Sequence, residues 1–412
     1  MDEALSCIRS LPERDPRVRR GRRSKFDHQI DQFLDADVSV DWVQEGLARQ
    51  TVGDKIEELL LDAYEQDNPK EEFVASFRSY MSDTFGSPKP TYTVYFPINF
   101  SAFHTPPDRF EQGVEIDRIP YDEWETYRGE AEQLDEIAEF FSQHPNDFDE
   151  DTFTFWEADV GARDVVVPPN IVYDAVVTLL GQIQYSFHLR GLHPRDDSNG
   201  LPKHSWSNLR APPILLVADE DGDINYAHAI DRNHRRAETV QWVDDNRRNR
   251  FDSIPSLDSE SAYDKKLLDA FHAHQRGMAE PRKHSSFLYF WQGLERLATR
   301  DDERANTGDT VERARFVYEQ LGDIDPVFND VLRDLANKRN SLVHEGPNTT
   351  IARRFQEYTK VLLDGMITLY LECRDDFTGQ KMNDLLEYGP GDWKRAGLVR
   401  QLSEREIDFE RK

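Results

Sequence analysis

The spacing of apolar residues first marks a helical segment at the start of the chain. Between residues 26 and 85 the apolar positions recur three and four residues apart, as they do on one face of an α-helix. One such face comprises Ile56, Leu59, Leu60, Ala63 and Tyr64, and a second comprises Phe73, Phe77 and Tyr80. Pro88 and Pro90 end this pattern, because proline lacks the amide hydrogen that a helix needs. We therefore expect a helical N-terminal segment over residues 1–89.

Residues 90–255 alternate between strand-like and helix-like patterns. β-Branched and aromatic residues predict strands, and helical spacing predicts two helices, the first acidic and the second apolar. One strand is expected over residues 91–100, and two short strands are expected around Gly161, within residues 153–167. A hairpin is expected over residues 214–230, with its turn at Asp221-Gly222. The helices are expected over 121–144 and 171–189, and loops over 193–202 and 236–257. This mixture indicates a mixed α+β domain.

From residue 257 onward the pattern is helical. We expect five helices, over residues 262–278, 284–299, 310–321, 325–345 and 351–373, with Asp309 as the N-cap of the third. Helices of this length with short connections are typical of a bundle. The predicted fold class is therefore α+β, a mixed N-terminal region followed by an all-α bundle over residues 256–378. Residues 379–412 are expected to form a peripheral acidic tail.

The fourth predicted helix combines apolar spacing with reactive side chains. Its apolar stripe comprises Leu332, Leu335, Ala336, Leu342 and Val343, and Gly346-Pro347 is expected to end the helix. At about 100° per residue, Arg339 falls near the centre of this stripe. A guanidinium there is costly unless a carboxylate, a phosphate or another subunit meets it.

Two further polar residues lie at the same helix end. Asn340 and His344 are four residues apart and share a neighbouring face. In the last turn, the negative end of the helix dipole favours the imidazolium form of His344. A cation, an amide and a titratable imidazole suit a phosphodiester, because the arginine can hold the phosphate while the histidine moves protons. The alternative is a buried salt bridge with a capping histidine.

The stretch Arg339-Asn-Ser-Leu-Val-His344-Glu-Gly resembles the Arg-x4-His signature of HEPN domains. Upstream, Phe287-Leu-Tyr-Phe-Trp-Gln-Gly-Leu-Glu295-Arg-Leu resembles the second helix of the ApeA-like branch, so the resemblance covers roughly residues 256–376. It implies a metal-independent endoribonuclease that acts on RNA as a homodimer, with both Arg-His pairs lining one cleft. Other members of this family have lost catalysis and serve as RNA-binding or dimerisation modules, which is the alternative for this chain.

The resemblance also assigns a role to each residue. Arg339 would orient the scissile phosphate and stabilise the transition-state charge, and Asn340 would support that contact. His344 would take the 2′-hydroxyl proton or protonate the leaving 5′ oxygen, which leaves 2′,3′-cyclic phosphate and 5′-hydroxyl ends. Glu295 would fix Arg339, the alternative being a solvated helix carboxylate. The implied setting is anti-phage defence or a toxin-like role, with a neighbouring antitoxin or sensor protein as a further candidate partner.

Composition bears mainly on the conditions under which RNA would be bound. The chain has 412 residues and a net charge of −28, with 79 acidic residues against 51 basic ones, of which 13 are lysine. An acidic, lysine-poor surface is expected of a protein from a halophilic archaeon; an acidic mesophilic protein from a GC-rich genome is the alternative. In molar salt the Debye length falls to about 3 Å, so a local basic site can bind RNA despite the overall charge.

A basic segment near the N-terminus is a second candidate RNA contact. Residues 14–25 contain seven basic residues, and the candidate RNA-binding side chains are Arg17, Arg19, Arg20, Arg22 and Arg23. A solvated arm is the plainer interpretation of such a run.

Other features limit the chemistry that the sequence supports. The two cysteines, Cys7 and Cys373, exclude a disulfide framework and a Cys-based zinc finger. No His-Glu-x-x-His motif and no phosphate-binding glycine motif occurs, so we expect neither a metal site nor a cofactor. The chain begins with no signal-like apolar run, and no stretch approaches about 18 apolar residues. We therefore expect a cytoplasmic protein without a membrane segment.

Overall fold

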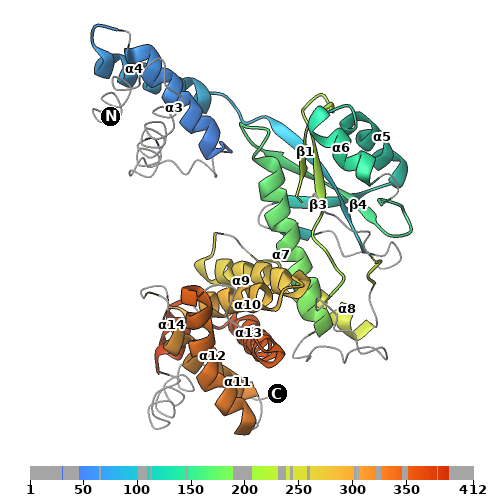
Figure 1. Cartoon of the computed structure of the whole chain (residues 1–412), viewed down its shortest axis with the longest axis vertical. Helices are drawn as coiled ribbons and strands as arrows, with labels where there is room; N and C mark the ends of the chain where they lie inside the picture. Colours follow the sequence, from blue (N-terminus) through green and yellow to red (C-terminus); the bar gives the residue numbers. More distant parts are fainter. Residues whose placement is uncertain are drawn as a thin grey trace.

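The computed structural model arranges the chain as a helical hairpin, an α+β body and a helical bundle (Figure 1). It describes residues 30, 46–64, 66–100, 109–111, 114–144, 147–188, 207–230, 238–241, 245–257, 260–300, 304, 306–321, 326–345, 351–377 and 379–388. Several predicted features lie outside these residues: the basic segment 14–25, the loop 193–202, the helix end at Gly346-Pro347 and the tail beyond Tyr388.

An antiparallel sheet lies at the centre of the α+β body. Its strands follow the spatial order β2-β3-β4-β1-β5-β6, and each neighbouring pair is antiparallel. They are β1 (Thr91–Ile98), β2 (Arg109–Glu111), β3 (Val114–Ile119), β4 (Thr154–Gly161), β5 (Ile214–Ala218) and β6 (Ile224–Ala229). The predicted hairpin is confirmed as β5 and β6, and its turn residue Gly222 has a φ of 85°, which glycine adopts at little cost.

The sheet differs from the prediction in two places. The prediction of two strands around Gly161 is wrong, because β4 is one strand that ends there. Beyond it the Asp164 carboxylate accepts a hydrogen bond from the Val166 amide at 3.1 Å, and this turn leads the chain into the next helix. The prediction also omitted β2 and β3, although the buried Val114 and Ile116 alternate with charged neighbours in β3 as expected of a strand.

Helices cover both faces of the sheet. α5 (Tyr121–Ala131) and α6 (Asp135–Gln143) pack on one face, and α7 (Pro168–His188) packs on the other (Figure 1). The prediction of one continuous helix over residues 121–144 is wrong, because Leu134 is extended, with a ψ of 120°, and begins a second helix. The change of direction lets both helices cover the sheet, and Phe141 of α6 is buried there.

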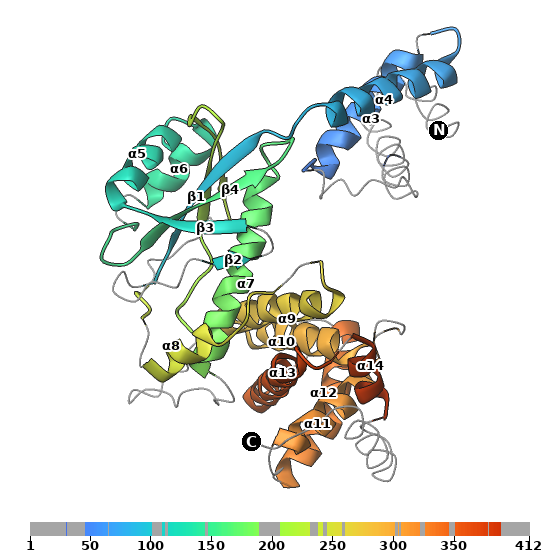
Figure 2. The same cartoon turned by 180° about the vertical axis from the view of Figure 1, so that it is seen from behind.

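The C-terminal helices form a bundle that shares its core with the sheet. They are α9 (Ala262–Ala279), α10 (Lys283–Ala298), α11 (Thr307–Leu321), α12 (Pro326–Glu345), α13 (Arg353–Cys373) and α14 (Gly379–Tyr388). One continuous set of buried residues runs from β1 and β4 through α7 into α9, α10 and α13. Figure 2 shows α7 reaching from the sheet to α9 and α10. The predicted boundary at residue 255 is therefore no break in packing, because α7 contributes to both parts.

Gly181 allows α7 and α9 to pack closely. A Cβ atom at this position would lie 2.0 Å from the carbonyl oxygen of Phe271 on α9. Because a backbone atom rather than a flexible side chain stands in the way, Gly181→Ala is expected to lower the free energy of unfolding by about 3 kcal/mol, the upper end for overpacking. Denaturant unfolding measures this change.

The control for this substitution is Gly129→Ala on the exposed face of α5. A Cβ atom there meets nothing within 4 Å, so alanine should stabilise the helix by about 0.5–1 kcal/mol. Equal effects of the two substitutions on the free energy of unfolding would mean that α7 and α9 can accommodate a methyl group at residue 181 without loss of stability.

The region between the sheet and the bundle contains a helix where the sequence pattern predicts a loop. Residues 245–252 form α8 (Asp245–Asp252), so the prediction of a loop over 236–257 is wrong there. Phe251 is fully buried, and Arg250 Nη1 donates to the carbonyl oxygen of Ser186 on α7 at 2.7 Å. A single apolar residue anchors this otherwise polar helix, which is why helical periodicity did not reveal it.

Two further predictions are also wrong, one about the start of the third bundle helix and one about the segment after residue 379. The third bundle helix begins at Thr307, so Asp309 lies inside its first turn, and the Asn306 side chain instead accepts a backbone amide hydrogen bond at 2.9 Å. The segment after residue 379 is not peripheral at its start, since Met382 and Leu386 of α14 are buried in the bundle core.

The N-terminal helices form a hairpin with a small core of their own. α3 (Arg49–Tyr64) and α4 (Pro69–Gly86) confirm the predicted helices, and Phe73 is buried between them. Tyr64, predicted on the apolar face, is exposed. The carbonyl oxygen of Gly46 accepts hydrogen bonds at 2.9 and 3.0 Å from two backbone amides just after β4, which links this hairpin to the sheet.

Candidate active site

Helix α12 carries the candidate residues and packs against α11 and α13. Leu332, Leu335 and Leu342 are buried, as predicted. Val343, predicted in the same stripe, is 55% exposed, so that part of the prediction is wrong. The buried face is thus narrower than the spacing of apolar residues indicates, and residue 339 lies at its rim rather than at its centre.

The Arg339 side chain is partly exposed and makes two long polar contacts. It is 26% exposed, its Nη2 lies 3.4 Å from Glu295 Oε1, and its Nη1 lies 3.4 Å from Asn340 Oδ1. Charge-assisted hydrogen bonds are normally about 2.7–2.9 Å long, so both contacts are loose. A guanidinium has five N–H donors, and these contacts engage two of them. The side chain is held in place while it keeps donors for an anionic ligand.

Glu295 comes from α10 and connects Arg339 to the bundle core. Its Oε1 also accepts a hydrogen bond from the indole Nε1 of the buried Trp291 at 3.3 Å. The Glu295 side chain is 19% exposed. The structure therefore brings Glu295 and Arg339 together, 44 residues apart in the sequence, and places Glu295 against the guanidinium rather than in open solvent.

Asn340 lies between α12 and α11. Its Oδ1 accepts a hydrogen bond from the Thr307 hydroxyl at 3.2 Å as well as the contact from Arg339. Thr307, at the start of α11, was not singled out by the sequence analysis, because only the packing of these two helices places it here. Asn340 is thereby fixed beside Arg339 on the bundle surface.

His344 lies in the last turn of α12 and is exposed. Within the described part of the chain it has no hydrogen-bond partner. Five residues along an α-helix correspond to a rotation of about 140°, so Arg339 and His344 of one chain point in different directions. Val343 lies between them on the helix surface. The structure brings Arg339, Asn340 and Glu295 together, but His344 stands apart from this cluster.

Other reactive groups of the described residues offer little competing chemistry. Nowhere among them do three histidine, cysteine, aspartate or glutamate side chains gather closely enough to hold a metal ion. Burial raises the pKa of Cys373 to about 11, which keeps its thiol protonated and unreactive near neutral pH. In the same part of the chain no helix combines the length and apolarity required to cross a membrane.

Comparison with known proteins adds no family assignment. No family model matches this chain. No curated protein and no solved structure matches it either. The residues of α10, α11 and α12 and the resemblance of their sequence are therefore the basis for assigning a function.

Proposed function

We propose that this chain is a metal-independent endoribonuclease of the HEPN type, with Arg339 and His344 as its catalytic residues. The observation that carries the proposal is the state of Arg339. Its guanidinium is loosely held by Glu295 at the rim of the bundle, partly open to solvent, on the helix that ends with an exposed histidine. A guanidinium that is held in place but has N–H donors left for a ligand is suited to bind a phosphodiester.

In the proposed reaction Arg339 binds the non-bridging oxygens of the scissile phosphate, and Asn340 keeps the guanidinium oriented. The 2′-oxygen attacks phosphorus while the bond from phosphorus to the 5′-oxygen breaks. A histidine base takes the 2′-hydroxyl proton, and a histidine acid supplies a proton to the leaving 5′-oxygen. The products carry a 2′,3′-cyclic phosphate and a 5′-hydroxyl, and no water is consumed in this step.

The angle between Arg339 and His344 supports a site shared by two copies of the chain. Within one chain the two side chains leave α12 in directions about 140° apart, so we infer that a second copy completes a site that uses both. Val343, exposed between them, would lie at the centre of the contact between two α12 helices, where an apolar side chain is favoured. A homodimer would bring the imidazole of one copy toward the guanidinium of its partner.

The test is an RNA cleavage assay with the wild-type protein in the presence of EDTA. We expect cleavage to persist, the products to carry 2′,3′-cyclic phosphate ends, and a substrate with a 2′-deoxy residue at the cut site to remain intact. RNA that is bound but never cut would instead identify the alternative, an inactive RNA-binding or dimerisation module. Growth arrest when the active protein is expressed would support the toxin-like or anti-phage role that we propose for it.

A further inference from the structure

A polar cleft lies between α7, α9 and α10 and is lined by none of the candidate active-site residues. Its volume is about 410 Å³, which is within the range of small-molecule sites. The polar side chains that line it are Asp174 of α7, Asp269, His272 and Arg276 of α9, and Gln292 and Arg296 of α10. Three helices thus contribute charged or hydrogen-bonding groups to one hollow at the junction of the α+β body and the bundle.

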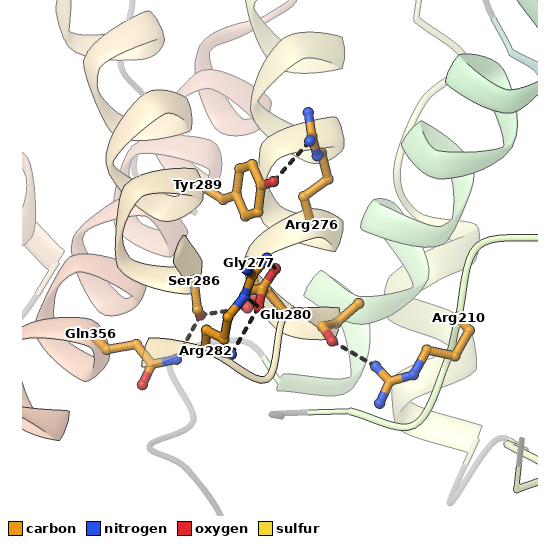
Figure 3. A network of polar contacts seen from close by, with 9 residues as sticks. Arg210, Arg276, Gly277, Glu280, Arg282, Ser286, Tyr289 and Gln356 are labelled. Carbon is orange, nitrogen blue, oxygen red and sulfur yellow. Dashed lines mark hydrogen bonds and ion pairs between the residues drawn. The ribbon is translucent and has the colours of Figure 1, made fainter. Parts of the chain in front are cut away.

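Arg276 is the strongest indication of a ligand. Its Nη2 donates to the hydroxyl of Tyr289 at 2.8 Å, and its guanidinium carbon lies 4.3 Å from the centre of the Tyr289 ring (Figure 3). Across the described residues no carboxylate comes within 4 Å of this guanidinium. The side chain is therefore held by an aromatic ring, which attracts a cation without neutralising it. A cation held in this way beside a cleft can bind an anion.

A second guanidinium lines the same cleft from the neighbouring helix. Arg296 Nε donates to Asp269 Oδ2 at 2.7 Å, and both side chains are about half exposed. Because this hydrogen bond uses Nε, the two terminal nitrogens of the Arg296 guanidinium can donate to another acceptor. The amide of Gln292, one turn earlier on α10, adds an uncharged donor.

Two carboxylates and a histidine, Asp174 of α7 and Asp269 and His272 of α9, also line the cleft. Partial burial raises the pKa of Asp174, which disfavours its carboxylate form. Burial likewise lowers the pKa of His272, which contacts the backbone of Asp174 and stays neutral. Asp269 pairs with Arg296, while the Arg276 guanidinium acts on Asp174 through space and has no direct ion pair among the described residues. Two guanidiniums beside two carboxylates keep the cleft close to neutral in a chain with a net charge of −28.

We propose that this cleft binds a small phosphate monoester, with the phosphate between the guanidiniums of Arg276 and Arg296. A phosphate monoester dianion matches two guanidiniums from adjacent helices, and each can offer paired N–H donors to phosphate oxygens. Gln292 and the neutral His272 then contact the rest of the ligand. The proposal does not depend on the nuclease activity.

Isothermal titration calorimetry on the full-length protein tests this proposal, with adenosine 5′-monophosphate and inorganic phosphate as probes. We expect both to bind saturably, adenosine not to bind, and Arg276→Gln and Arg296→Gln each to weaken binding at least tenfold. Arg282→Gln is the matched control, because Arg282 is exposed nearby but pairs with Glu280 outside the cleft (Figure 3). It should bind the probes like the wild type.

Several results would overturn the proposal. They are the absence of binding by both phosphate probes, wild-type affinity in the two cleft variants, and an equal loss of affinity in Arg282→Gln. A titration with succinate, a dicarboxylate, tests whether the cleft prefers carboxylates. Tighter binding of succinate than of phosphate would also refute the assignment of a phosphate ligand. Because Arg276 and Arg296 are surface residues, thermal melts of the variants should match the wild type and show that folding is intact.

Discussion

Replacing His344 by alanine should lower the rate of RNA cleavage by about 10²–10⁴-fold, the usual contribution of a positioned general acid or base. The side chain is exposed and has no hydrogen-bond partner in the described part of the chain, so its loss should leave folding unchanged. Single-turnover cleavage of one defined RNA measures the effect. His228→Ala, which removes an exposed histidine on β6, is the matched control and should cut at the wild-type rate.

A wild-type rate in His344→Ala would exclude this histidine from the chemistry. If RNA binding is also retained in that variant, the proton transfers must be assigned to other groups. If the variant binds RNA and dimerises but does not cut, the role of His344 in proton transfer is supported separately from any role in assembly.

The second large effect is expected in the bundle core, where three polar side chains are fully buried together. Asp364 Oδ2 accepts a hydrogen bond from Lys360 Nζ at 2.6 Å, and Asp364 Oδ1 lies 3.1 Å from His274 Nε2. All three side chains have no exposed surface. Asp364→Ala would leave the ammonium without its counter-charge, which typically costs about 3–5 kcal/mol of the free energy of unfolding.

Chemical denaturation measures this loss. The control is Asp375→Ala, since the Asp375 side chain is 95% exposed and should contribute no more than about 0.5 kcal/mol. Asp364→Ala with the stability of the wild type would show that the buried ammonium finds another acceptor.

The same group of residues makes stability depend on pH. Burial alone would raise the pKa of Asp364, but the charge of Lys360 and the hydrogen bond from His274 together lower it below its usual value. A depressed pKa means that the unfolded chain takes up the proton first, so the stabilisation is present above about pH 4 and is lost as the pH falls further. The stability difference between the wild type and Asp364→Ala should therefore shrink in acid. A constant difference from pH 7 to pH 3 would contradict this assignment.

The sequence predicts those elements whose apolar residues alone decide their structure. The apolar positions of α7, α9, α10 and α13 repeat at helical spacing, and Asp221-Gly222 fixes the hairpin turn. The break at Leu134 was not predictable from glycine or proline, because neither occurs there; packing against the sheet decides it. Val343 is a similar case, since the positions of α11 and α13 decide which apolar residues of α12 are buried.

The candidate site was likewise predictable only where a local sequence pattern identifies its residues. The spacing within α12 and the resemblance identify Arg339, Asn340 and His344, and they also suggest Glu295 on another helix. Thr307 and the cleft beside Arg276 depend on how separate helices cross, and no local pattern reports that. The proposed arrangement of Arg339 and His344 across two copies would depend on assembly, which neither the local sequence nor a single chain reports.

A single-turnover assay in EDTA should show that Arg339→Ala cuts RNA far more slowly than the wild type. In the proposed site the guanidinium at the rim of the bundle stabilises a reacting phosphate, and loss of one such donor typically costs about 10²–10³-fold in rate. Arg128→Ala, which removes an arginine paired with Glu125 and Glu132 on the distant α5, should cut like the wild type. We expect Arg339→Ala to fold and dimerise but to cut the RNA about 10²–10³-fold more slowly than the wild type. An Arg339→Ala protein that folds, dimerises and cuts at the wild-type rate would contradict the assignment of Arg339 to the reaction.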